Sequence, residues 1–314
     1  MNILRLDDSP GPALSAALQS FEREFTYPLG NSRRFHVSHG DDYLRFFRAI
    51  GRARCFVAED GGAVHGTIAV VRRRVGMPDG SEQEAAYLAD LKVRPDACAG
   101  RVLLRLVREL QSLEEAPPRA AFGIVMDGTR AVPSSYTGRL GIPLFGVLAK
   151  LAVLQCTTLD SRAVGGVTAS SASDGERLYR RLSHGRFSTP GGAPSERSQM
   201  VPEWLCDENG EACGCIEDTR SAKRLWTEEG EEMKSAHLSA FAYLSASAGA
   251  RLLLEACLRA ANQGFGKLFV SVAADDAPAF RRELGTNVIV EAPATIYGYG
   301  LAAGQSWNAN TAEI

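Results

Sequence analysis

The stretch Tyr87–Leu106, YLADLKVRPDACAGRVLLRL, has the residue types expected of a site for an anion such as a phosphate or pyrophosphate. It reads as a strand, then Pro95-Asp96, then a loop of small residues, then a helix with apolar periodicity. The first N–H groups of a helix have no partner within the helix, and the helix dipole favours negative charge there. We therefore expect an anion site where this helix opens, near Gly100.

Asp90 is the first candidate for acid–base chemistry. Because side chains alternate along a strand, Leu88, Asp90 and Lys92 are expected on one face. A carboxylate within an otherwise apolar strand needs a reason, since unpaired burial is costly. One reason is a substrate cleft in which burial raises the pKa of Asp90 and makes it a base. The other is an ion pair with an arginine of the neighbouring strand, at positions 72–74.

Two histidines are weaker candidates for proton transfer. His36 and His39 fall in an expected loop, where either imidazole could act as a base, although a lone loop histidine is commonly a plain surface group. No spacing of His, Asp and Glu predicts a metal site. The sequence has no Walker loop and no serine nucleophile elbow.

The composition describes a soluble globular chain. It has 314 residues, 45% hydrophobic and 23% charged, with a formal net charge of -2. This balance gives no bulk electrostatic case for nucleic acid or an anionic membrane. The start MNILRLDDSPGP lacks the apolar segment of a signal peptide, and the longest apolar stretch, 141–156, is too short to span a bilayer. We expect no nucleic-acid partner and no membrane partner.

The cysteines favour a reducing compartment. Seven cysteines are scattered along the chain, and an odd number without a spaced framework predicts reduced thiols in a cytoplasm. Cys206, Cys213 and Cys215 could gather on one hairpin, but a zinc site would need a fourth ligand and no histidine lies nearby. We therefore expect ordinary thiols and no metal.

The elements that must position these residues alternate between strand and helix in both halves of the chain. The strand signals include the Asp60-Gly61-Gly62 turn of a hairpin. In the first half, the expected elements are a hairpin at 54–75, a strand at 84–93, a helix at 100–113 and a strand at 121–126. In the second half, they are a hairpin at 204–218, a strand at 233–244, a helix at 249–262, a strand at 268–273, a helix at 278–284 and a strand at 288–299.

The repeated order predicts two similar α/β units. Arg139-Leu140-Gly141 follows the buried strand of the first half, and Glu283-Leu284-Gly285 stands in the same place in the second. The alternative is one mixed α/β domain with chance Leu-Gly pairs. A stretch rich in Gly, Ser and Pro separates the halves. The expected parts are an N-terminal unit at 1–160, a linker at 161–198 and a C-terminal unit at 199–314.

Residues 54–146 resemble a domain of the GNAT (GCN5-related N-acetyltransferase) superfamily. That family runs through a hairpin, a long strand, a phosphate loop with its helix, a buried strand and a short helix ending in Leu-Gly. Val93-Arg94-Pro95-Asp96 is similar to the family's exit from the long strand, and Leu140-Gly141-Ile142 to its Leu-Gly-Phe. The resemblance implies an α/β (mixed α+β) fold of two GNAT-like units, each a mixed, mostly antiparallel sheet flanked by helices, with a degenerate second copy.

The resemblance implies acetyl-CoA as cosubstrate, but the phosphate loop departs from the family's Arg-Gly-x-Gly-x-Gly/Ala. Cys98 stands at the Arg position, and Arg101 and Leu103 stand at two Gly positions, although Arg101 could itself reach a phosphate. In the second unit, Ser245–Ala250 has small residues without a basic one, and we expect it not to bind CoA. The residues implied to bind the cosubstrate are Leu91, Lys92, Val93, Cys98, Ala99, Gly100, Arg101, Val102 and Leu103.

The activity implied by the resemblance is direct transfer of an acetyl group to an amine of a small molecule or peptide. A backbone N–H near 91–93 would polarise the acetyl carbonyl, Asp90 would be the base and Tyr136 the acid for the thiolate. A homodimer is compatible with the resemblance. Because the loop departs from the family, a non-catalytic relative that binds a small molecule or assembles with a partner stays open as the alternative.

Overall fold

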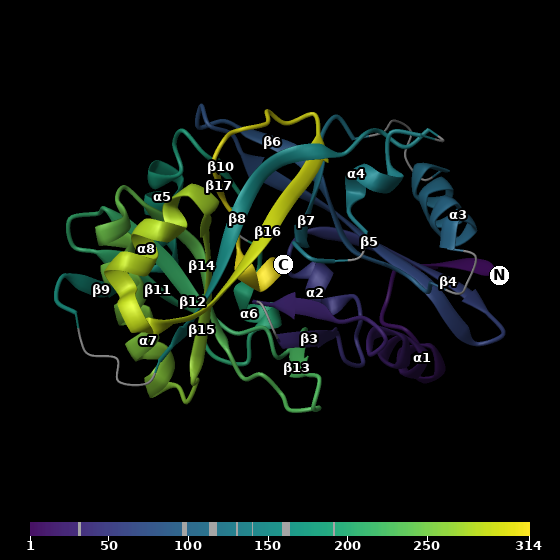
Figure 1. The fold of residues 1–314 in the computed structure, drawn as a ribbon, viewed down its shortest axis with the longest axis horizontal. Coiled ribbons are helices and arrows are strands. Elements are labelled where there is room, and N and C mark those ends of the chain that lie inside the picture. The colour runs from purple at the N-terminus through teal and green to yellow at the C-terminus, as the bar shows by residue number, and fades with distance from the viewer. Residues whose placement is uncertain are drawn as a thin grey trace.

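One fourteen-stranded sheet runs through the molecule, and helices pack on it in both halves of the chain (Figure 1). The computed structural model describes residues 1–30, 33–95, 99–112, 118–129, 131–139, 141–158, 164–190 and 192–314. The N-terminal half forms one end of the molecule and the C-terminal half the other, and β8 and β16 cross between them (Figure 1). This is the mixed α/β fold that the sequence predicts.

Most strands lie on one hydrogen-bonded path across the large sheet. From edge to edge these are β1 (Asn2–Leu6), β4 (Arg52–Asp60), β5 (Ala63–Gly76), β6 (Glu82–Val93), β7 (Ala121–Met126), β16 (Val288–Tyr299), β8 (Gly146–Thr157), β15 (Lys267–Ala273), β14 (Ala236–Tyr243), β12 (Ala212–Glu217), β11 (Glu203–Asp207) and β9 (Val167–Ser170). Attached to this path are β10 (Phe187–Ser188) and β17 (Trp307–Asn308), and a separate sheet holds β13 (Arg224–Thr227), β3 (Arg33–Ser38) and β2 (Tyr27–Leu29).

The helices lie between these strands, and they include helices at the expected ranges 100–113, 249–262 and 278–284. The α-helices are α1 (Pro12–Glu22), α2 (Arg45–Arg48), α3 (Ala99–Ser112), α4 (Pro133–Tyr136), α5 (Ala172–Leu182), α6 (Pro194–Arg197), α7 (Ala246–Asn262) and α8 (Ala277–Leu284), and the 3₁₀ turns are η1 (Ala274–Asp276), η2 (Gly285–Asn287) and η3 (Thr311–Glu313).

The two halves repeat one arrangement and also share strands. We call β4, β5, β6 and β7 with α3 the first unit, and β11, β12, β14 and β15 with α7 the second unit. In each, two antiparallel strand pairs lead to a third strand that pairs in parallel with the fourth. However, β16 from the C-terminal half lies between β7 and β8 of the N-terminal half. The division of the chain at residues 160 and 199 therefore stays a prediction. Strands from both sides of this division pair in one sheet.

Close packing of α3 on the sheet positions the end of β6. Val102 and Leu106 of α3 are buried in an apolar cluster with Phe56 and Ile68 of the hairpin. A Cβ at Gly66 would lie 2.8 Å from Val102 Cγ1, so only glycine leaves room for the helix there. This contact holds the first turn of α3 beside the last residues of β6.

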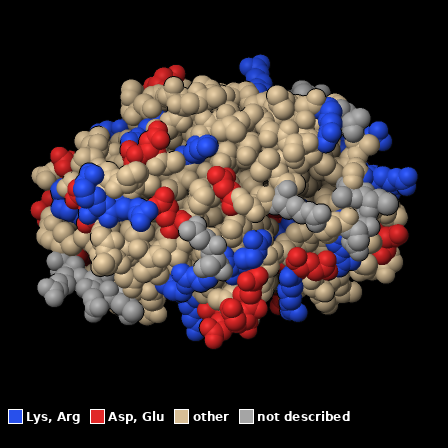
Figure 2. Space-filling view, viewed as in Figure 1, with Lys and Arg blue, Asp and Glu red and all other residues tan. Residues whose placement is uncertain are grey.

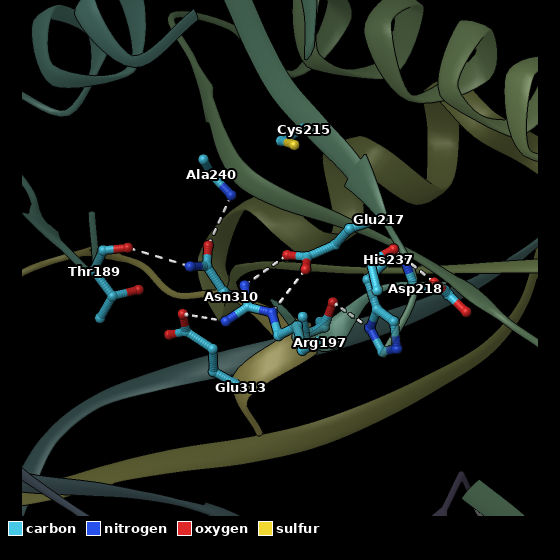
Figure 3. A network of polar contacts seen from close by, with 12 residues as sticks. Thr189, Arg197, Cys215, Glu217, Asp218, His237, Ala240, Asn310 and Glu313 are labelled. Carbon is cyan, nitrogen blue, oxygen red and sulfur yellow. Dashed lines mark hydrogen bonds and ion pairs between the residues drawn. The ribbon is translucent and has the colours of Figure 1, made fainter. Parts of the chain in front are cut away.

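A buried network of charges joins the two halves. The segment 161–198, expected to be a linker, contains β9, α5, β10 and α6. Arg197 at the end of α6 donates to both carboxylate oxygens of Glu217 at 2.7 Å and to Glu313 at 3.3 Å (Figure 3). The other carboxylate oxygen of Glu313 pairs with Arg73 of β5 at 2.5 Å. All four side chains are buried, so this network fixes the C-terminal turn η3 between the units.

The surface carries charges of both signs. On the face shown in Figure 2, basic and acidic side chains lie intermixed, as the formal net charge of -2 suggests. Among the described residues, no helix has the length and apolar character needed to cross a membrane.

Glu217→Gln should lower the free energy of unfolding by about 3 kcal/mol, because it leaves the buried Arg197 guanidinium without its main counter-charge. Urea unfolding followed by fluorescence measures this change. The control is Arg177→Ala, which removes an exposed ion pair with Asp174 and should cost about 0.5 kcal/mol or less. Equal effects of the two variants would contradict the assigned importance of the buried network.

Candidate active site

The third and fourth strands of each unit separate after a short stretch of pairing. In the first unit, β6 pairs with β7 only at Ala86–Ala121 and Tyr87–Phe122, although β6 continues to Val93. In the second unit, β14 pairs with β15 only through Ala236 and His237. We call the space between Leu88–Val93 of β6 and the end of β7 the first opening, and the space between 238–243 of β14 and the end of β15 the second opening.

A β-bulge lies on the long strand at each opening. In β6 the register slips so that Asp90 and Leu91 together face one residue of β5, and Asp90 has φ of 51°. In β14 the same slip leaves Ala240 with φ of 47°. A positive φ is unfavourable for a residue with a Cβ, so its occurrence at equivalent places in both units is strong support for the internal repeat.

The bulge also corrects the expected strand alternation. Leu88 packs against an apolar cluster that includes Phe145 and Tyr297, whereas Asp90 and Lys92 lie among polar side chains of α1 and the segment after β3. The three residues therefore do not share one face, because an extra residue in the bulge shifts the alternation.

The two openings differ in what fills them. The second opening is filled by the chain itself: the amide oxygen of Asn310 accepts from the Ala240 N–H at 2.7 Å (Figure 3), and Ser271 donates to the carbonyl of Ala309. All of β14 is buried. In the first opening, Leu88–Leu91 and the facing residues Ile124 and Val125 are only half-buried. Among the described residues, the first opening is therefore the more accessible.

Of the residues expected to bind the cosubstrate, Leu91, Lys92 and Val93 lie on the part of β6 that borders the first opening. Leu91 and Val93 contact the apolar cluster under α3, while the Lys92 side chain is buried on the opposite side of β6. Gly100 and Arg101 are exposed at the start of α3, where a Cβ at Gly100 would meet no atom within 4 Å. Val102 is buried and Leu103 half-buried. Cys98 and the side chain of Ala99 lie outside the described residues.

At the start of α7, a serine side chain already engages one of the N–H groups that could bind an anion. Ser245 is the N-cap of α7, and its hydroxyl oxygen accepts from the Ala248 N–H at 3.2 Å. This bond uses one of the N–H groups that an anion would need. The expectation that the second unit binds no CoA stays a prediction.

Asp90 belongs to a buried polar cluster on the side of β6 that faces α1. Its carboxylate lies 2.5 Å from Lys92 Nζ and accepts a hydrogen bond from the Tyr43 hydroxyl. Lys92 Nζ is also 3.8 Å from Glu22, and Glu22 is 2.5 Å from His39 Nδ1. The ion pair that the sequence allows is thus present, but its partner is Lys92 and not an arginine at 72–74.

The electrostatics of Asp90 differ from the sequence-based expectation. Burial alone raises the pKa of its carboxyl, but the Lys92 ammonium, His39 and the Tyr43 hydrogen bond together outweigh burial and hold the pKa below its usual value. The raised pKa, one of the two alternatives that the sequence leaves open, is therefore not found. Burial lowers the pKa of Lys92, but the combined attraction of Asp90, Tyr27 and Glu22 outweighs burial and raises the pKa. A carboxylate held in this way is a weak proton acceptor at neutral pH.

Three members of the cluster also have the geometry of metal ligands. One ligand atom each from Glu22, His39 and Asp90 lies within 4.8 Å of the others. Lys92 Nζ lies 3.8 Å from Glu22 and 2.5 Å from Asp90, so an ammonium already supplies positive charge at this place. The residues fit an internal ion pair better than a divalent cation, because Lys92 would repel the cation.

Tyr136 is the last residue of α4. This short helix follows β7 along the chain, and β7 borders the first opening. Burial and the nearby Tyr297 raise the pKa of its hydroxyl to about 12. The hydroxyl is therefore protonated at neutral pH and is able to donate a hydrogen bond. Its assignment as the acid for the thiolate stays a prediction, and Leu140 of the Leu-Gly pair lies outside the described residues.

A pocket of about 690 Å³ lies on the α1 side of the polar cluster. His39 and Lys223 line it, together with Arg23, Arg45 and Trp226. Its volume falls within the range of small-molecule sites. Because His39 also contacts Glu22, the pocket adjoins the polar cluster that contains Asp90.

Two members of the cluster are not among the residues singled out from the sequence. Glu22 lies four residues after Leu18, on the buried face of α1, so an acid on an apolar helix face was the available signal. Tyr43 is one of several aromatic residues in this part of the chain, and nothing local shows that its hydroxyl meets Asp90, which is 47 residues away.

The fold is similar to that of solved N-myristoyltransferase and GCN5-related N-acetyltransferase structures, in agreement with the GNAT-like fold that the sequence predicts. The chain is similar to N-myristoyltransferase from Saccharomyces cerevisiae with bound myristoyl-CoA, with a TM-score of 0.63 and 10% identity over 96% of this chain and 79% of that one. A second structure of that enzyme gives a TM-score of 0.61 and 9% identity over 96% and 83%. A GCN5-related N-acetyltransferase from Anabaena variabilis gives 0.51 and 11% over 95% and 72%.

Similarity to known proteins is confined to structure. No protein-family model matches the chain, and no curated protein sequence matches it. At identities of 9–11%, the structural likeness shows the fold alone.

Lys223 should make stability depend on pH. Burial lowers the pKa of its ammonium from 10.5 to about 7 in the folded protein. Between these values the unfolded chain binds more protons than the folded one, so the free energy of unfolding rises with pH. From pH 7 to 9 the rise should be on the order of 2 kcal/mol. Urea unfolding at both pH values should show this rise in the parent and lose it in Lys223→Met. An equal rise in both proteins would contradict the assignment.

Proposed function

We propose that this protein is an N-acyltransferase that binds an acyl-CoA in the first opening and transfers the acyl group to an amine. The observation that carries this proposal is the difference between the openings: the second is filled by Asn310 and its neighbours, whereas the first has half-buried walls. An opening whose walls stay half-exposed in one of two repeated units is a natural place for a ligand.

The bulge supplies a group suited to the acyl carbonyl. In the second opening, an amide oxygen of Asn310 accepts from the N–H of Ala240. Asp90 occupies the equivalent bulge position in the first unit, so its N–H is the donor that would meet a carbonyl oxygen of a ligand. A fixed N–H at this place would stabilise the negative charge that develops on the carbonyl oxygen during transfer.

The start of α3 supports binding of the phosphates. Its first N–H groups are free of intrahelical partners, and Arg101 is exposed in the first turn. Within the described part of the chain, no carboxylate pairs with Arg101, so its guanidinium is available to a phosphate. This charge is the proposed substitute for the arginine and glycines of the family's loop.

Acetyl-CoA is the proposed donor, and an amine of a small molecule or peptide the proposed acceptor. The similar structures include an N-acetyltransferase and an N-myristoyltransferase bound to myristoyl-CoA, so acyl chain length needs its own test. The acceptor would enter through the pocket lined by His39 and Lys223. The six cysteines that the structure describes are free thiols, which supports a reducing, cytoplasmic setting.

Calorimetric titration with acetyl-CoA should show binding, and Arg101→Ala should weaken it about tenfold through the loss of one charge-assisted hydrogen bond. Arg108→Ala, an exposed arginine two turns further along α3, is the matched control and should bind as the parent does. A second titration with myristoyl-CoA separates a short-chain from a long-chain donor.

Transfer itself is tested with a panel of primary amines, by following release of the CoA thiol. The absence of detectable acyl-CoA binding at millimolar ligand would reject the proposed function. Binding of acyl-CoA without transfer to any amine would favour the non-catalytic alternative.

A further inference from the structure

Transfer to an amine requires a group that takes a proton from the attacking nitrogen, and Asp90 is poorly placed for this task. Its carboxylate lies 2.5 Å from Lys92 Nζ and accepts from the Tyr43 hydroxyl, while Thr67 donates to its backbone carbonyl at 2.9 Å. The side chain is only 8% exposed. A second group must therefore be sought near the same cluster.

His39 is held rigidly at the boundary between this cluster and the pocket. Its backbone N–H donates to one carboxylate oxygen of Glu22 at 3.0 Å, and its Nδ1 lies 2.5 Å from the other. The rings of Tyr43 and Phe47 pack against the imidazole, with centroids 5.1 and 4.9 Å away. Since Glu22 engages Nδ1, Nε2 is the nitrogen left to accept a proton.

The charge of the cluster favours this role. Glu22 and Asp90 are two carboxylates facing one ammonium, that of Lys92, and all three side chains are buried. The three groups together carry one excess negative charge. A proton taken up by His39 balances this charge within a region of low dielectric constant, where such a balance matters most.

Other charged groups face His39 from the pocket. Lys223 Nζ lies 4.5 Å from the ring centroid of Phe46, which itself packs against His39 at 5.3 Å. Lys223 donates to the carbonyl oxygens of Ala312 and Ile314, so two of its protons are engaged by the C-terminal turn.

We propose that His39, oriented by Glu22, is the base that receives the proton of the acceptor amine. This inference rests on the proposed N-acyltransferase function. As the amine nitrogen bonds to the acyl carbon, its N–H proton moves to His39 Nε2 and the bond from the acyl carbon to sulfur breaks. The CoA thiolate then takes a proton, for which the Tyr136 hydroxyl is the predicted donor. His39 acts on the substrate, and Glu22 is a positioning residue that fixes the imidazole.

The test compares His39→Gln with His184→Gln, a substitution of an exposed histidine outside the pocket, in the full-length chain. We expect kcat to fall about 100-fold in His39→Gln, as for loss of a general base, with no change in the calorimetric affinity for acetyl-CoA. His184→Gln should match the parent. Glu22→Gln should lower kcat about tenfold with an unchanged KM for acetyl-CoA, because it loosens the imidazole without removing it.

Rescue separates a base from a structural role. Added imidazole should restore part of the activity of His39→Ala in proportion to its concentration, and it should not affect Glu22→Gln. If the unsubstituted protein transfers acyl groups and the His39→Gln variant has the same kcat, this inference is overturned and the proposed function stays intact. A parent that binds acetyl-CoA but acetylates no amine would reject the proposed function and this inference together.

Discussion

The buried charges of Arg197, Glu217, Glu313 and Arg73 are the constraint on which the rest of this structure depends. Four charged side chains inside a protein are tolerated only when each meets an opposite charge, and here each carboxylate meets at least one guanidinium. Because these residues come from α6, β12, η3 and β5, satisfying them requires both halves of the chain to be in place together.

The same network explains why the two openings differ. By fixing Glu313, it places Asn310 opposite the Ala240 N–H, and the Tyr87 hydroxyl donates to the carbonyl of Glu313 at 2.6 Å. The C-terminal turn therefore fills the second opening while contacting the strand that borders the first. The C-terminal turn thus occupies the place of a ligand in the second unit and contacts β6 in the first unit. A repeated fold thereby acquires two different halves without a change in strand order.

The sequence predicts the elements of the fold well and the polar site poorly. Strands 84–93 and 121–126 and the helix from 100 follow from periodicity and turn residues, and the structure has β6, β7 and α3 there. The bulge at Asp90 leaves no mark in the sequence, because Asp90 fits ordinary alternation. The contacts of Asp90 with Tyr43, and of Glu22 with His39, join separate elements, and spacing along the chain cannot reveal them. For the same reason, the insertion of β16 between β7 and β8 is invisible in a local pattern.

That insertion has a consequence for how the protein is made. During synthesis, β7 and β8 emerge long before β16, and they cannot pair with each other as they do with it. The backbone N–H and C=O groups on one edge of each strand stay unpaired while more than a hundred further residues are added, at about 5–20 residues per second. The centre of the sheet therefore closes only after β16 has been synthesised. Until then, the nascent chain exposes two strand edges of the kind that pair with other polypeptides, and a chaperone that covers them would serve this chain well.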